Sequence, residues 1–264
     1  MAGDSSTRSF AARGIVEKIG FDLRQVTINH EAIPGYMAAM TMDFSVQNTN
    51  ELNGILAGDQ ITFTLVVSKN DGWVENIHRT GQTASIITNT MPVMPELQPG
   101  DQLPDGTLTT EDGRPVRFSD FRGKAIAFTF FFTRCPMPNY CPLMNRNFAA
   151  ARDLITSTPN APTNWEFLSI SFDPENDTPE VLANFGGFYR HGDPSHWLFA
   201  AAPTNTLAIL APSLDLMVVH QGASISHNLR TVVLDPHGRI YRQFDGNQWT
   251  SRELADTVLD AARQ

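Results

Sequence analysis

Cysteine is nearly absent from this chain: its 264 residues include two, Cys135 and Cys141. Two cysteines that lie close together in sequence cannot supply the disulfide framework of a chain this long, so a redox pair or a metal-binding pair is the better interpretation. Long apolar runs are missing as well. None approaches the roughly 20 residues that a helix needs to cross a bilayer, so we expect no membrane anchor in this chain.

Basic residues are outnumbered by acidic ones. The chain has 19 Lys and Arg against 28 Asp and Glu, which gives a formal net charge of −9. This balance argues against nucleic acid and against anionic membrane surfaces as main partners. Residues 1–9 are polar and lack the apolar core of a signal peptide. The expectation is therefore either a cytosolic protein or an exported one whose leader is absent from this sequence.

The stretch 125–142 has the pattern of a strand, a cysteine loop and the start of a helix. Its first eight residues are almost continuously apolar, as in a strand buried on both faces, and residues 143–155 have helical spacing. Open α/β sheets place their chemistry in loops between the end of a strand and the start of a helix. We expect the helix N-terminus, together with Arg134 beside Cys135, to lower the pKa of a thiol in this loop.

Changes in composition divide the chain in two. Residues 10–82 contain five short strand patterns, which predict a small closed all-β barrel. Residues 83–96 are rich in Thr, Asn, Pro and Met and carry little charge, and we interpret them as a linker. Residues 97–264 alternate strand and helix patterns, which predicts a mixed α/β sheet. A capping box of Thr250 and Glu253 predicts a C-terminal helix.

His30 and three methionines, Met37, Met40 and Met42, form the first candidate metal site. Thioether and imidazole groups are ligands that suit Cu(I). Met40 and Met42 share one face of an extended segment because strand side chains repeat every two residues, and His30 at the end of the neighbouring strand could reach them. The alternative is that these methionines only fill the core, which is a common use of methionine.

The residues around this cluster resemble the CusF-like periplasmic copper-binding domain. The similarity covers about residues 10–80. It rests on three segments, at residues 26–33, 39–44 and 56–59. The resemblance implies a five-stranded OB-type barrel that binds Cu(I) or Ag(I), with His30, Met40 and Met42 as its ligands. That family has a Trp three residues before the first Met, where this chain has Met37, so Met37 is expected either as a further thioether ligand or as a shield of the site.

Cys135 and Cys141 form the second candidate site. Five residues separate them, and a proline follows each, which stiffens the loop and removes backbone donors. Two thiolates with one imidazole would make a trigonal Cu(I) site. The same pair could cycle as a disulfide. A third alternative is two buried structural thiols, although a loop from a strand to a helix favours reactive thiols.

The second half of the chain resembles the Sco/SenC family over about residues 97–264. The resemblance rests on four segments, at residues 121–124, 131–142, 171–179 and 227–238. It implies a thioredoxin-like fold with an accessory hairpin, and a copper site made by Cys135, Cys141 and His227. Proteins of that family deliver copper to, or reduce the cysteines of, the binuclear copper centre of cytochrome c oxidase. The family usually has three residues between its cysteines, whereas this chain has five.

Together the two sites predict a periplasmic copper metallochaperone with two domains. In this hypothesis the barrel captures Cu(I) and passes it to the cysteine–histidine site for a cuproprotein such as cytochrome c oxidase, with Cu(II) as an open alternative at that second site. Three rival hypotheses remain. They are a thiol–disulfide oxidoreductase that reduces cuproprotein cysteines, a peroxiredoxin-like peroxidase, and a copper-resistance buffer without a delivery partner.

Overall fold

The computed structural model describes residues 7–20, 23–82, 96–221 and 224–264. These residues form two compact units. The predicted linker at 83–96 falls outside the described residues except for its last position. Among the described helices, none is both long and apolar enough to cross a membrane.

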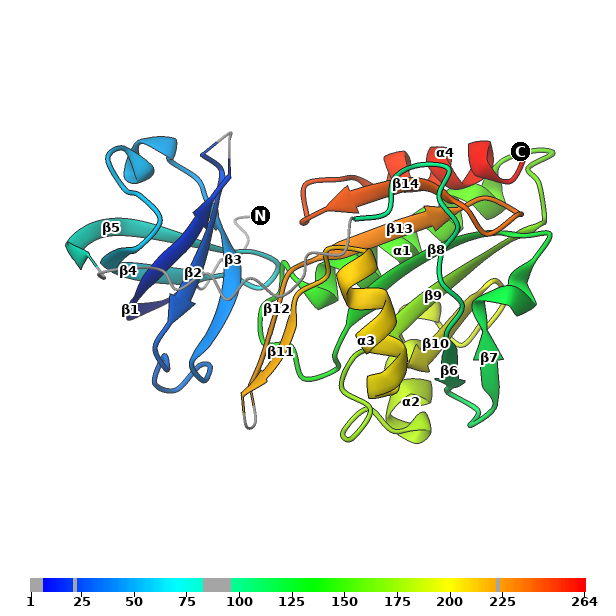
Figure 1. The fold of residues 1–264 in the computed structure, drawn as a ribbon, viewed down its shortest axis with the longest axis horizontal. Coiled ribbons are helices and arrows are strands. Elements are labelled where there is room, and N and C mark those ends of the chain that lie inside the picture. The colour runs from blue at the N-terminus through cyan, green and yellow to red at the C-terminus, as the bar shows by residue number, and fades with distance from the viewer. Residues whose placement is uncertain (1–6, 21–22, 83–95, 222–223) are drawn as a thin grey trace, which may run out of the picture. The chain divides into compact units, whose positions relative to one another are not determined.

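The first unit is built on five strands that form a closed ring (Figure 1). The strands are β1 (Arg8–Ile19), β2 (Gln25–His30), β3 (Met40–Val46), β4 (Asp59–Val67) and β5 (Gly72–Gln82). They follow the order β1-β2-β3-β5-β4 around the ring. All neighbours are antiparallel except β3 and β5, which are parallel. A short 3₁₀ helix, η1 (Thr49–Leu52), follows β3. The prediction of an all-β first region is confirmed.

Side chains from every second position of a strand fill the interior of this ring. On β2 the buried positions are Val26, Ile28 and His30, each two residues from the next. Strand side chains point to opposite faces in turn, so these three share the inner face. The aromatic ring of Phe44 lies in the same interior, 5.5 Å from the imidazole centroid of His30 and 5.6 Å from the ring of Phe63. The one histidine on β2 is thus enclosed by apolar groups.

The second unit contains a seven-stranded sheet in the order β14-β13-β8-β9-β10-β6-β7. The strands are β6 (Thr107–Thr110), β7 (Pro115–Arg117), β8 (Ala125–Phe131), β9 (Trp165–Ser171), β10 (Trp197–Ala201), β13 (Arg230–Leu234) and β14 (Ile240–Asp245). Strands β8, β9 and β10 are parallel, and the flanking strands pair antiparallel to their neighbours. The predicted mixed α/β sheet is confirmed. A 3₁₀ helix, η2 (Phe118–Phe121), follows β7.

Strands β11 (Val218–Gln221) and β12 (Ser224–His227) pair antiparallel in a separate two-stranded sheet.

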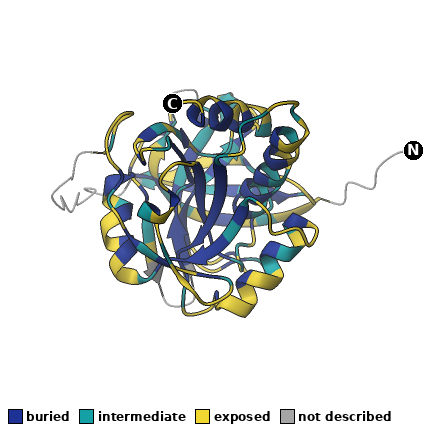
Figure 2. Cartoon of the chain, turned by 90° about the vertical axis from the view of Figure 1, so that its right-hand side faces the viewer, coloured by how far each residue is buried: buried dark blue, intermediate teal, exposed yellow. Residues whose placement is uncertain are grey.

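Helices cover the parallel strands. They are α1 (Cys141–Ser157), α2 (Pro179–Arg190), α3 (Thr204–Ser213) and α4 (Ser251–Ala261). Helices α1 and α4 contact each other and β8, while α2 contacts α1 and β10. Every residue of β8 and of β9 is buried as a result. Figure 2 shows the central strands as buried and the surrounding helices with exposed outer faces. This burial explains the continuous apolar run that replaces alternation in β8.

The helix boundaries follow the local sequence signals. Thr250 and Glu253 form the predicted capping box at the start of α4. Thr178 caps α2, and Pro179 occupies its first turn, where a missing N–H costs nothing. Helix α1 begins at Cys141, two residues before the helical spacing becomes visible in the sequence. That early start places Cys141 in the first turn of a helix.

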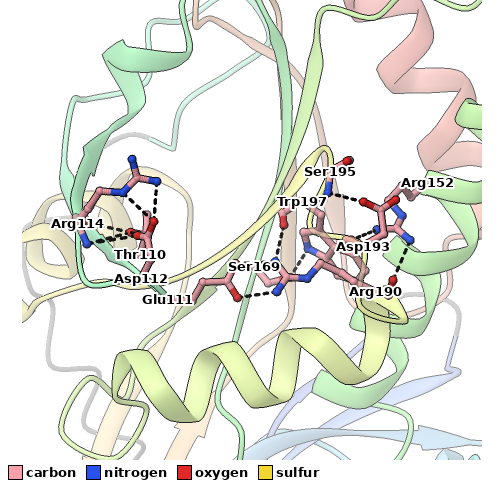
Figure 3. A network of polar contacts seen from close by, with 10 residues as sticks. All are labelled: Thr110, Glu111, Asp112, Arg114, Arg152, Ser169, Arg190, Asp193, Ser195 and Trp197. Atoms are coloured by element: carbon pink, nitrogen blue, oxygen red, sulfur yellow. Dashed lines mark hydrogen bonds and ion pairs between the residues drawn. The ribbon is translucent and has the colours of Figure 1, made fainter.

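A buried ion pair joins the residue after β6 to the end of α2 (Figure 3). Arg190 donates from both terminal nitrogens to the carboxylate oxygens of Glu111, at 2.5 and 2.7 Å. Its Nη1 also donates to the carbonyl of Trp197 at 2.8 Å. The two charged side chains are only 7% and 12% exposed. A two-point contact of this kind holds α2 against the edge of the sheet.

Candidate metal centres

Cys135, Cys141 and His227 come together in the structure. Their potential ligand atoms, two thiol sulfurs and an imidazole nitrogen, all lie within 4.8 Å of one another. Cys135 follows β8, Cys141 opens α1, and His227 ends β12. Cys141 and His227 are buried, while Cys135 is half-buried. Among the described residues this is the cluster of three Cys, His, Asp or Glu side chains that is close enough to hold a metal ion.

A turn positions Cys135, and the first turn of a helix positions Cys141. After β8, the backbone N–H of Cys135 donates to the carbonyl of Phe132 at 3.3 Å, which closes a turn. Pro142 lies at the start of α1, where proline is tolerated. The two thiols are not joined by a disulfide. An S–S bond of about 2.05 Å needs specific dihedral geometry, so oxidation of this pair would have to bring both sulfurs into that arrangement.

The imidazole of His227 is held by a backbone carbonyl. Its Nδ1 lies 2.9 Å from the carbonyl oxygen of Asn228. A carbonyl only accepts, so Nδ1 carries the proton and Nε2 presents its lone pair. Metal-binding histidines commonly show this arrangement, because the second nitrogen fixes the tautomer and the ring orientation.

Burial dominates the acidity of Cys141. Loss of solvent raises the pKa of the Cys141 thiol well above its ordinary range, and the neighbouring Cys135 raises it further. The predicted lowering by the helix N-terminus is therefore wrong for this cysteine. Arg134, the other expected source of positive charge, forms an ion pair with Asp173 at 2.7 Å. The Cys141 thiol is thus protonated in the metal-free protein, and a bound metal would have to displace that proton.

The second candidate set lies inside the ring of the first unit. His30 on β2 stands directly opposite Met40 on β3, and Met42 stands opposite Ile28. Met40 and Met42 are two residues apart on one strand and therefore share the inner face with His30. Met37 precedes β3 and forms an isolated bridge with Ile33. All three methionines are at most 8% exposed.

His30 repeats the orientation of the other histidine. Its Nδ1 lies 2.7 Å from the carbonyl oxygen of Glu31, so Nδ1 is the protonated nitrogen. Its Nε2 is buried and has no hydrogen-bond partner within the described part of the chain. Burial lowers the pKa of His30 below its ordinary value of 6.5, and the contact with Glu31 opposes this only in part. A neutral imidazole with an unused, buried lone pair beside thioethers fits a soft metal ion such as Cu(I).

A cavity of about 620 Å³ lies beside this histidine, within the first unit. Its lining includes Arg13, Asn29, His30, Gln60 and Thr80. The cavity therefore reaches His30, which is itself only 1% exposed.

Sequence patterns pointed to the candidate metal-binding side chains, but they did not indicate what orients them. The two carbonyls that fix the histidine tautomers belong to Glu31 and Asn228, each the residue after its histidine. Backbone carbonyls leave no signal in the sequence. The carboxylates of Asp173 and Asp177, by contrast, belong to an acidic motif that is visible in the sequence.

Two families match separate parts of the chain. Residues 98–263 match SCO1/SenC, and residues 9–79 match the family described as copper binding periplasmic protein CusF. No curated protein matches the chain.

Solved structures similar to the chain include several Sco proteins. The copper-bound ScoI of Arabidopsis thaliana is 21% identical, with 62% of this chain and 99% of that chain covered and a TM-score of 0.53. A SCO1/SenC family lipoprotein from Bacillus anthracis is 24% identical, with 64% and 98% covered and a TM-score of 0.55. BsSco, described as a member of the Sco family of cytochrome c oxidase assembly proteins, is 21% identical, with 63% and 97% covered and a TM-score of 0.52.

At these identities the structural likeness shows the fold, which is the thioredoxin-like fold of Sco proteins. The SCO1/SenC match covers more than half of the chain. The resemblance seen in the sequence is thereby confirmed for both parts. The chain belongs to the SCO1/SenC family, and it carries a CusF-like domain before its Sco domain.

Proposed function

We propose that this protein is a periplasmic Cu(I) chaperone with two sites in series. Copper enters at His30, Met40 and Met42, and it leaves through Cys135, Cys141 and His227 towards a cuproprotein such as cytochrome c oxidase. The observation that carries the proposal is that one chain holds two copper-compatible sets of donors. Each set includes a buried histidine whose Nδ1 is held by a carbonyl.

The two families support the compartment, the cargo and the partner. The CusF family is named for copper binding in the periplasm. A structurally similar Sco protein was solved with copper bound, and another belongs to a family of cytochrome c oxidase assembly proteins.

We also propose that the ring of five strands is an OB-type barrel, with domain limits at 10–82 and 97–264 and a linker at 83–96. Met37 is an additional ligand or a shield in this scheme.

Charge favours transfer in the proposed direction. Histidine and methionine offer neutral donors, whereas two cysteines offer thiolates once their protons leave. A monovalent copper ion is attracted more strongly to an anionic site than to a neutral one. Transfer therefore releases protons from the cysteines, including the proton that burial holds on Cys141. Linkage in one chain raises the effective concentration of the two sites for each other.

An anaerobic Cu(I) titration against a competing chelator tests the proposal. The full chain is compared with Cys135→Ser/Cys141→Ser and with Met40→Leu/Met42→Leu. We expect two tightly bound equivalents in the parent protein and one in each double variant. No tight copper in the parent protein would refute the chaperone function. One equivalent that only the cysteine variant loses would refute the role of the first site.

A second function has an observation in its favour. The two thiols are reduced and their sulfurs lie within 4.8 Å of each other, which suits a pair that cycles through a disulfide. A thiol–disulfide oxidoreductase would turn over a disulfide substrate in the absence of copper. Turnover without copper, with no copper transfer to an acceptor, would favour this function. A copper-resistance buffer would instead bind two equivalents and transfer none to a cuproprotein.

A further inference from the structure

We infer that Asp177 and Asp173 are positioning residues for Cys135, which fix the loop after β8 and thereby set the metal affinity of the cysteine site. All of the contacts involved lie within the second unit. The inference deepens the proposed function and rests on it for the identity of the metal. The positioning itself is a property of the cysteine pair, so it can also be tested without copper.

Asp177 is a fully buried carboxylate with an unusually complete set of donors. Its Oδ2 accepts from the backbone N–H of Thr133 at 3.1 Å and from the hydroxyl of Ser171 at 2.5 Å. Its Oδ1 accepts from the hydroxyl of Thr133 at 2.5 Å. A buried charge is costly unless hydrogen bonds compensate it, so this carboxylate forms a strong link between the end of β9 and the residue two before Cys135.

Asp173 holds the next residue of the same loop. Its Oδ2 accepts from Nη2 of Arg134 at 2.7 Å, and its Oδ1 accepts from the side-chain amide of Asn176 at 2.8 Å. Its own backbone N–H donates to the hydroxyl of Ser171 at 3.0 Å. Ser171 therefore bridges the two aspartates. Thr133 and Arg134, the two residues that lead to Cys135, are each fixed by one carboxylate.

A turn or capping role does not account for Asp177. The N-cap of α2 is the next residue, Thr178, whose hydroxyl accepts from the N–H of Val181. The backbone N–H of Asp177 completes the turn by donating to the carbonyl of Asp173 at 2.8 Å. The carboxylate takes no part in either of these contacts. It accepts hydrogen bonds from Thr133, in the loop that carries Cys135.

The spacing of the cysteines explains why such a link matters. Cys141 is anchored by the start of α1, whereas Cys135 lies in a loop six positions earlier in the chain and is half-buried. Because the loop between the two cysteines is longer, the fixed position of Cys141 restrains Cys135 less. Fixing residues 133 and 134 from the end of β9 compensates for this, because it limits the positions that the Cys135 sulfur can take relative to Cys141.

The test compares Cu(I) affinity at the cysteine site in a matched series on the full chain. Asp177→Asn keeps the shape but removes an acceptor. Thr133→Val removes one hydroxyl donor, whereas Thr133→Ser retains it. Glu175→Gln, at an exposed position of the same loop, is the control for charge. Changes to residues that support metal ligands typically cost 10–100-fold in affinity, so we expect about that loss for Asp177→Asn and Thr133→Val, and parental affinity for Thr133→Ser and Glu175→Gln.

Two further measurements keep the test decisive. Thermal unfolding of each variant separates a loss of affinity from a loss of fold, and if Asp177→Asn does not fold, the Thr133 pair decides. Parental affinity in Thr133→Val overturns the inference.

If the parent protein binds no copper at the cysteines, the proposed function fails. The equilibrium constant for the Cys135–Cys141 disulfide against dithiothreitol then decides: a lower constant in Thr133→Val than in Thr133→Ser supports positioning, and equal constants overturn it.

Discussion

At the scale of single residues, the histidines of the two candidate centres are oriented in the same way. His30 and His227 each donate from Nδ1 to the carbonyl of the following residue, at 2.7 and 2.9 Å. The lone pair of each ring is therefore on Nε2, which is the tautomer that the proposed metal binding requires. Preorganisation of this kind lowers the cost of binding, because neither tautomer nor ring orientation has to change.

The titration of His30 predicts how the metal-free protein responds to acid. Burial lowers the pKa of His30 below its value of 6.5 in an unfolded chain. Below pH 6.5 the unfolded state therefore binds a proton that the native state does not, so the free energy of unfolding falls as the pH falls towards the native pKa. Urea unfolding at pH 7.5 and pH 5 should show a smaller acid-induced loss in His30→Gln than in the parent protein. Equal losses in the two proteins would contradict this prediction.

The two cysteines are predicted to differ in reactivity. The thiolate is the nucleophile, and burial raises the pKa of Cys141 while excluding reagents from it. Cys135 is half-buried and more accessible. Mass spectrometry after brief treatment of the copper-free protein with iodoacetamide at pH 7.5 should find the label on Cys135 first. Faster labelling of Cys141 would mean that its environment is more open than the structure shows.

At the scale of elements, buried polar links connect segments that the sheet alone would not hold. The pair of Glu111 and Arg190 ties the end of α2 to the strand β6, and the neighbouring pair of Asp112 and Arg114 lies at the surface (Figure 3). Arg114 holds the pKa of the Asp112 carboxyl down at about 2. The two pairs differ mainly in burial, so they form a natural comparison.

Loss of the buried pair should destabilise the second unit strongly. Glu111→Ala leaves the guanidinium of Arg190 buried without its counter-charge, and breaking such pairs typically costs about 3–5 kcal/mol. Arg114→Ala breaks only the exposed pair and should change stability little. Chemical denaturation of both variants at neutral pH gives the comparison. Similar stabilities for the two variants would show that the buried pair does not hold α2.

At the scale of the whole molecule, the chain joins a CusF-like domain to a Sco domain. Covalent linkage has a kinetic consequence, because transfer within one chain does not depend on protein concentration. Transfer between two chains does. The order of the transfer reaction therefore distinguishes a two-site chaperone from two independent copper proteins that share a polypeptide.

Copper transfer in the parent protein should be first order. Copper is delivered in substoichiometric amount to the parent chain, and its arrival at the cysteines is followed by the loss of iodoacetamide labelling. For comparison, Cys135→Ser/Cys141→Ser loaded with copper is mixed with Met40→Leu/Met42→Leu, so that transfer must pass between chains. We expect a rate independent of concentration in the parent protein and a rate proportional to concentration in the mixture. The same concentration dependence in both would rule out hand-over within one chain.

Local sequence patterns were enough to predict the class of each unit and the residue types of both candidate sites. Alternation of apolar residues decides which face of β2 and β3 points inward, and a continuous apolar run decides that β8 is covered on both sides. These signals are local, since they depend on neighbours a few positions away. The capping box of Thr250 and Glu253 is readable for the same reason.

The burial and the hydrogen-bond partners of each candidate site residue, by contrast, depend on the folded chain. The burial that raises the pKa of Cys141 comes from elements distant in sequence, and it outweighs the helix N-terminus that a local view favours. The carboxylate of Asp177 reaches Thr133 across 44 positions of the chain, and His227 lies at the end of the β11–β12 hairpin, far from the cysteines in sequence. Burial and long-range contacts are set by packing, and packing depends on the whole fold rather than on any one segment of the sequence.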